Sequence, residues 1–96
     1  MGVSTSAVSP VLAGPEGELL LVRIRIPAAQ LERLLDSLAV MPFPINPELQ
    51  HGYPLSTVEF PAYASRAIEV RRLLDSAGLR GVDLAMSPML AELRAV

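Results

Sequence analysis

The sequence predicts a small α+β domain in which a strand, a turn and a helix occur twice. Residues 24–28 lead into a helical run that ends in Arg-Leu-Leu-Asp-Ser, and residues 58–62 lead into another that ends in the same five letters. Apolar and polar residues alternate up to a proline in both segments, which is typical of a strand that ends at a turn. The duplication therefore predicts two strand–helix units packed around one core.

Length and composition predict one domain that associates with itself. The chain has 96 residues, of which 51% are hydrophobic. A domain of this size buries only about 60–65% of the surface that its unfolded chain exposes. Apolar surface that one copy cannot bury is usually covered by a partner. We therefore expect a homodimer or a higher homo-oligomer.

Charge and residue types argue against several classes of function. The formal net charge is −2 and the 8 basic residues are all arginines, so the basic stripe typical of nucleic-acid binding is not expected. The chain has no cysteine, which removes disulfides and thiolate metal sites. It has neither an apolar run of membrane-spanning length nor the pattern of a signal peptide. We expect a cytoplasmic protein with no cofactor, no metal, no membrane contact and no nucleic-acid partner.

The first half of the chain begins with a predicted flexible arm, residues 1–17, which is rich in Ser, Gly and Pro. The domain proper is predicted over residues 18–96. Its first strand covers residues 18–26, and a helix over residues 27–39 follows, because proline suits the first turn of a helix. The side chains expected in the core are Leu20, Val22, Ile24 and Ile26 of the strand and Leu31, Leu34, Leu35 and Leu38 of the helix.

The second half begins with three closely spaced prolines in residues 42–47. Proline cannot donate a hydrogen bond within a central strand, so this segment is predicted to be an edge strand with Phe43 and Ile45 facing inward. A loop is predicted over residues 47–54. The remaining elements are a strand over residues 55–60, a helix over residues 61–77, a strand over residues 81–86 and a short helix over residues 89–95. The buried stripe of the second helix is predicted to be Tyr63, Ala67, Val70, Leu74 and Ala77, and Gly78 is expected to end this helix in the left-handed conformation.

The predicted order of elements is strand–helix–strand–strand–helix–strand, which is the ferredoxin-like arrangement. Right-handed crossovers interleave its two halves. The prediction is a four-stranded antiparallel sheet of spatial order 4-1-3-2, with both helices on one face and a short C-terminal helix.

The other face of this sheet is the first candidate site. It is predicted to carry Leu19, Leu21, Arg23, Arg25, Thr57, Glu59, Asp83 and Ala85. Opposite charges on neighbouring strands pair readily, so one interpretation is a salt-bridged ladder on a sheet that water or a second subunit covers. The other is a site in which Arg23 and Arg25 hold a small anionic ligand, with Glu59 and Asp83 competing for the same guanidinium groups.

The loop over residues 47–54 is the second candidate site. It holds His51, the only histidine, together with Tyr53, and Asn46 precedes it. Polar residues on a loop over a rigid sheet are a usual place for function, and imidazole is the usual general base near neutral pH. No nucleophile stands at a recognisable spacing, so His51 and Tyr53 are weak catalytic candidates. The residues predicted to bind a ligand are Arg23, Arg25, Glu59, Asn46, His51 and Tyr53.

Two functions follow as hypotheses. The first is a non-catalytic module that binds a small molecule or regulates a partner and acts as a homo-oligomer. The alternative is a small dimeric-barrel enzyme, an isomerase or a cofactor-free oxygenase, with His51 as general base and Tyr53 or Arg25 steering the substrate.

Overall fold

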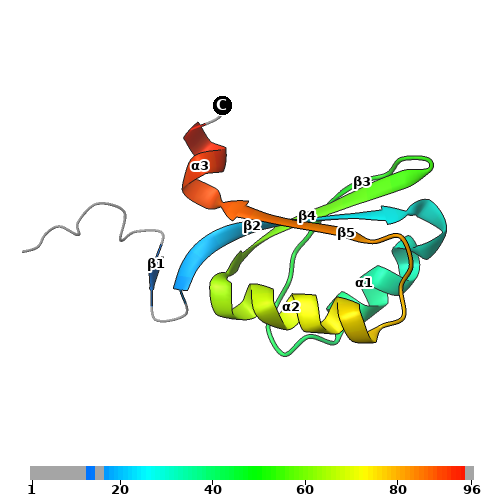
Figure 1. Cartoon of the computed structure of the whole chain (residues 1–96), viewed down its shortest axis with the longest axis horizontal. Helices are drawn as coiled ribbons and strands as arrows, with labels where there is room; N and C mark the ends of the chain where they lie inside the picture. The colour runs from blue at the N-terminus through cyan, green and yellow to red at the C-terminus, as the bar shows by residue number, and fades with distance from the viewer. Residues whose placement is uncertain (1–12, 15–16, 95–96) are drawn as a thin grey trace, which may run out of the picture.

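The computed structural model describes residues 13–14 and 17–94. It places two helices against one face of an antiparallel sheet, and a third, short helix follows the last strand (Figure 1). Most of the predicted arm lies outside the described residues. The elements are β1 (Ala13–Gly14), β2 (Gly17–Pro27), the 3-10 turn η2 (Ala28–Gln30), α1 (Leu31–Ala39), β3 (Glu48–Gln50), β4 (Leu55–Tyr63), α2 (Ala64–Ser76), β5 (Asp83–Pro88) and α3 (Met89–Arg94).

β2 is the central strand of the sheet. It pairs with β4 on one side and with β5 on the other, β3 pairs with the outer side of β4, and every pairing is antiparallel. The strands therefore follow the order β5–β2–β4–β3, which is the predicted order 4-1-3-2. β1 adds a short pairing at the start of β2, with Ala13 opposite Glu18.

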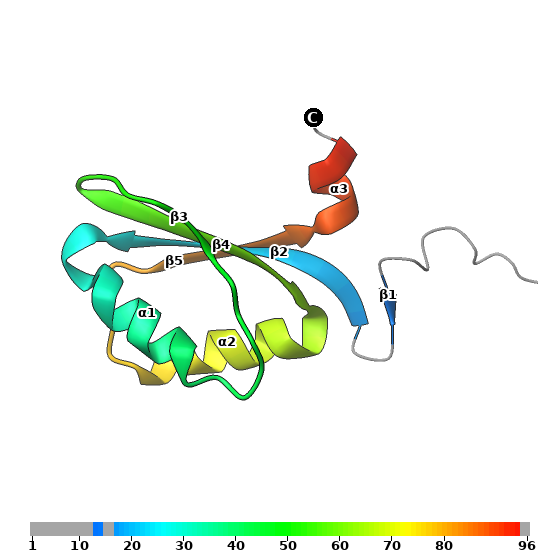
Figure 2. The same cartoon turned by 180° about the vertical axis from the view of Figure 1, so that it is seen from behind.

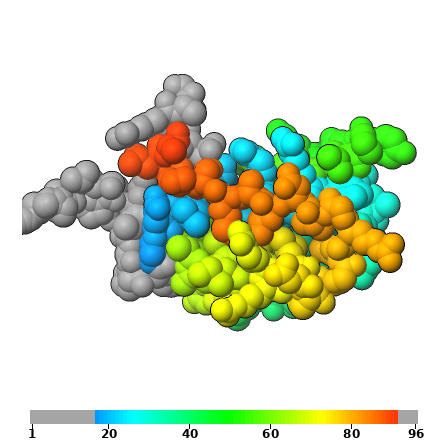
Figure 3. All heavy atoms as spheres, in the orientation of Figure 1, coloured from blue at the N-terminus to red at the C-terminus, as the bar shows by residue number. Residues whose placement is uncertain are grey.

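The core lies between the sheet and the two longer helices. Val22, Ile24 and Ile26 of β2 are fully buried, as their alternation predicts. Figure 2 shows α1 and α2 on the same side of the sheet, and in Figure 3 α2 fills the space directly beneath β5. The helices contribute the buried side chains Leu31, Leu34, Leu38, Ala67, Val70 and Leu74. One continuous apolar layer thus joins the two helices to the sheet. The opposite face of the sheet, which α1 and α2 do not cover, is here called the open face.

The predicted edge strand over residues 42–47 is wrong. This segment has no regular structure, and the edge strand is β3, within the segment that the sequence predicted as a loop. Proline has no N–H and cannot form a regular ladder, whereas Glu48, Leu49 and Gln50 all can. Phe43 and Ile45 nevertheless pack against the core, so their inward orientation is correct.

The start of the second helix is also later than predicted. β4 continues through Pro61 to Tyr63, and α2 begins at Ala64. β3 reaches only as far as Glu59, so Pro61 needs no outer hydrogen-bond partner and the strand can pass through it. Tyr63 therefore lies opposite Leu19 in the sheet and is half exposed, instead of belonging to the buried stripe of α2.

The turns after α2 agree more closely with the sequence. Gly78 follows the helix with φ of 72°, a conformation that glycine adopts without steric cost. The last strand begins at Asp83 rather than at residue 81, because Gly81 also has a positive φ, of 68°, and belongs to the turn. The short C-terminal helix is present as α3 and rises from the end of β5 on the side of the open face (Figure 1).

Candidate functional site

The strand register arranges the polar side chains of the open face in cross-strand rows. Glu48, Glu59, Arg23 and Ala85 follow one another across the four strands. The next row consists of Gln50, Thr57, Arg25 and Asp83. Residues directly opposite in a sheet interact, so each charged group here has a defined neighbour. The predicted residues Arg23, Arg25 and Glu59 are thus brought together on one surface.

Arg23 and Glu59 form an ion pair through Nε and Oε2 at the centre of the open face. Their side chains are 36% and 27% exposed, so water still screens the pair. Arg25 and Asp83 are also opposite in register, but both are exposed, and among the described residues no ion pair joins them. A hollow of about 230 Å³ lies over Arg23, Arg25, Asp83 and Ala85. An anion entering it would meet the Asp83 carboxylate as well as two guanidinium groups.

We expect the Arg23–Glu59 pair to contribute less than about 1 kcal/mol to the free energy of unfolding, because such half-exposed pairs rarely contribute more. A double-mutant cycle with Arg23→Ala, Glu59→Ala and the double variant, followed by urea denaturation, measures this coupling directly. The coupling should fall further in 1 M NaCl, where the screening length is only about 3 Å. A coupling of several kcal/mol that survives high salt would show that the pair is much less hydrated than its exposure indicates.

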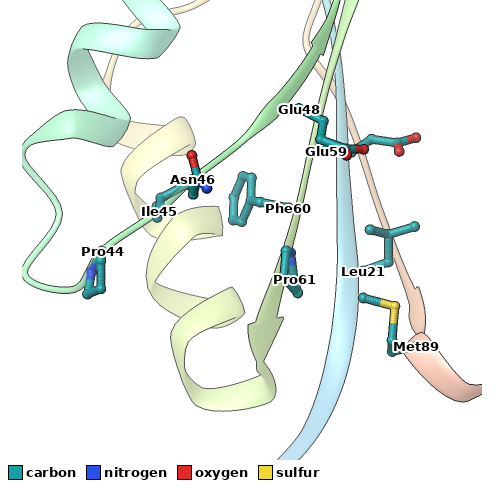
Figure 4. A pocket seen from close by; sticks show the side chains of 9 residues that line it. All are labelled: Leu21, Pro44, Ile45, Asn46, Glu48, Glu59, Phe60, Pro61 and Met89. Atoms are coloured by element: carbon teal, nitrogen blue, oxygen red, sulfur yellow. The ribbon is translucent and has the colours of Figure 1, made fainter.

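A larger hollow lies beside Glu48, the first residue of β3, where β3 no longer pairs with the outer side of β4. Its volume is about 670 Å³, and its walls come from the segment before β3, from β4, from β2 and from the start of α3. Figure 4 shows Glu48 and Glu59 together at one end, Leu21 and Met89 on the side of the open face, and Asn46 and Ile45 across the Phe60 ring. Of the predicted ligand-binding residues, this hollow takes Asn46 and Glu59.

The sequence did not indicate Phe60, Pro61 and Met89 as residues of this hollow, and it placed Glu48 only among the polar residues of the loop over residues 47–54. Glu48 becomes a neighbour of Glu59 only once β3 is placed at residues 48–50. Met89 was predicted to open a short helix, but nothing in its local sequence shows that this helix returns to Leu21. The one available signal was the proline-free run Glu48-Leu49-Gln50, whose polar–apolar–polar alternation is typical of a short strand.

His51 and Tyr53 lie apart from these hollows, in the loop between β3 and β4. His51 is exposed and Tyr53 is 93% exposed. The Ser56 hydroxyl holds this loop: it donates to the carbonyl of Gly52 and accepts from the N–H of Gly52, both at 3.2 Å. The N–H of Ala28 also donates to the carbonyl of Pro54 at 2.9 Å. In the single subunit, a substrate at His51 would therefore be in contact with water.

The described residues contain no group of three His, Asp or Glu side chains placed to hold a metal ion. Over the same ranges, no helix is long and apolar enough to cross a membrane.

The chain matches no model of a known protein family, and it matches no curated protein. The case for a function therefore depends on the open face and on the hollow beside it.

Proposed function

We propose that the protein is a non-catalytic interaction module of ferredoxin-like architecture that acts as a homodimer, with two copies meeting through their open faces. The order of the strands and the position of both longer helices on one side of the sheet support this architecture. The observation that carries the proposal is the composition of the open face, which combines apolar side chains with charges of both signs.

The apolar part of this surface extends beyond one strand. Leu19 and Leu21 of β2 are half-buried, and Tyr63 lies opposite Leu19. The β3–β4 hairpin adds Tyr53 and Leu55, two of the six large apolar side chains that are most exposed in the described part of the chain. The hairpin projects beyond the body of the domain, and α3 rises at the other end of the sheet (Figures 1 and 3). A second copy would then lie between the β3–β4 hairpin and α3.

The charges of the open face suit contact with a second copy of the same surface. Arg23 and Arg25 provide two positive groups, against the three carboxylates of Glu48, Glu59 and Asp83. A twofold axis brings each patch against its own copy, so a surface with mixed signs can pair its arginines with the partner's carboxylates. An isolated anion is favoured less, because Glu59 already engages Arg23.

The absolute mass in solution tests this proposal. Light scattering over a wide dilution series should give about twice the chain mass of 10.3 kDa. The chain has 2 tyrosines and no tryptophan, so its intrinsic fluorescence reports Tyr53 and Tyr63, at the two ends of the proposed contact. The tyrosine emission should change over the concentration range in which the mass falls to that of a monomer. A monomer at all concentrations would contradict the proposal.

A further inference from the structure

The hollow of about 670 Å³ beside β4 has the size and lining of a small-molecule site. Such sites usually measure about 300–1,000 Å³ and combine apolar walls with a few convergent polar groups. Here the apolar walls include Leu21, Ile45, Phe60 and Met89. The polar groups are the carboxylates of Glu48 and Glu59 at one end and, across the Phe60 ring, the amide of Asn46. All of these belong to one chain, so the hollow is complete without a second subunit.

The charge at the polar end of the hollow is unbalanced. Glu48 lies directly opposite Glu59 across the β3–β4 pairing, and like charges in this position repel. Arg23 pairs with Glu59 from the other side. Within the row Glu48, Glu59 and Arg23, the described side chains thus carry two negative charges and one positive charge, and a cation beside Glu48 would balance them. An anion here would meet two negative groups and is disfavoured.

The hollow continues along β4 into a second one of about 430 Å³, and the two share Pro44 and Pro61 in their walls. The lining of the second hollow is largely apolar or aromatic and includes Leu19, Phe43 and Tyr63. Arg66 stands at its border, with its guanidinium 5.0 Å from the centre of the Phe43 ring. An apolar chain attached to a cation at Glu48 would therefore have a continuous apolar path beside Pro61.

We infer that this hollow binds a small organic cation with an apolar tail, the ammonium group lying beside Glu48 and Glu59. The tail lies on the open-face side of β4, against Leu21, Pro61 and Met89. This inference goes beyond the proposed self-association, and it requires only the residues of one chain.

The test uses hexylamine as a probe, with hexanol and hexanoate as neutral and anionic controls of the same chain length. In nitrogen-edited NMR spectra of the whole protein, hexylamine should shift the amide signals of Leu21, Glu48, Glu59 and Met89 in a saturable manner. Hexanol should bind at least about fivefold more weakly and hexanoate more weakly still, because the ammonium group is lost or reversed in charge. Equal binding of all three probes, or saturable shifts that lie elsewhere, would overturn the inference.

A charge-removing variant locates the cation. Glu48→Gln should weaken hexylamine binding about fivefold, the effect of losing one partly hydrated ion pair. Glu48 is exposed, so this variant should fold normally. Glu32→Gln makes the same change on α1, on the helix side of the sheet, and should leave hexylamine binding unchanged. Equal effects of the two variants would indicate general charge attraction and would overturn the assignment of Glu48.

Light scattering on the same samples separates this inference from the proposed function. Saturable hexylamine binding to a protein that stays monomeric at every concentration would support the cation site and refute the homodimer. Saturable binding to the dimer at the same signals would support both. A dimer whose signals hexylamine shifts no more than hexanol and hexanoate do would support the homodimer and overturn the cation site.

Discussion

Ile24→Ala is expected to lower the free energy of unfolding by about 2–5 kcal/mol, the usual range for removing a fully buried aliphatic side chain. Ile24 is 0% exposed in the central strand, and its cross-strand neighbours are Val58 and Leu84. Both neighbours are anchored in their own strands, so they cannot readily move into the space left behind. Small domains are stable by only about 5–15 kcal/mol, so this variant should unfold at a much lower urea concentration.

Ile68→Ala is the matched control, since it removes the same atoms from a side chain that is 51% exposed on α2. Its effect should stay within about 0.5 kcal/mol, because surface substitutions are nearly neutral and alanine favours a helix more than isoleucine does. Urea denaturation with both variants at equal protein concentration gives the comparison. Similar losses for the two variants would contradict the assignment of the core to the helix side of the sheet.

The elements that the sequence predicts well are those whose burial pattern extends over several residues. In β2 the alternation from Leu20 to Ile26 identifies the buried face, because a shift of one residue would turn every apolar side chain toward water. The apolar stripe of α1 does the same for a helix. Crossover connections between strands are right-handed, which leaves few possible topologies for these elements. The predicted strand order follows from this restriction.

The elements that the sequence predicts poorly are short or change type beside a proline. β3 has three residues, all exposed, so no burial pattern identifies it. Pro61 is compatible both with the first turn of a helix and with a strand that lacks an outer neighbour. Pro61 can continue the strand because β3 is too short to pair with it, and the length of β3 depends on tertiary contacts. Tyr63 was assigned to the helix for this reason, although it belongs to β4.

The same uncertainty explains why the sequence indicated only part of the candidate site. Glu48, the first residue of β3, borders the hollow, and the chain before it passes on the helix side of β4 through Asn46 and Ile45. The outer side of β4 is therefore left uncovered from Phe60 onward, and the hollow forms there. A site that depends on where one strand stops has no local motif. Arg23, Arg25 and Glu59 were predictable because their positions depend only on the alternation of β2 and β4.

Ala85→Arg is expected to weaken the proposed homodimer by more than about 100-fold. Ala85 is exposed in β5, directly opposite Arg23 in the central row of the open face. In the single subunit the new side chain can extend into water, so its repulsion from Arg23 should lower the free energy of unfolding of the monomer by at most about 1 kcal/mol. In a dimer formed through the open faces, each copy would bring an additional positive group beside Arg23 and the partner's arginines. Like charges held together in a contact from which water is removed oppose association strongly.

Ala39→Arg provides the control for this variant. Ala39 is also exposed, but it ends α1 on the opposite side of the sheet, so the same change of size and charge should leave the mass unchanged. Light scattering of both variants over one dilution series, with urea denaturation to confirm that each folds, gives a direct comparison. A dimer that tolerates Ala85→Arg and dissociates with Ala39→Arg would place the contact on the helix side. Dissociation of the Ala85→Arg variant alone would place the dimer contact on the open face. Ala85 lies on that face opposite Arg23, whereas Ala39 lies at the end of α1 on the other side of the sheet.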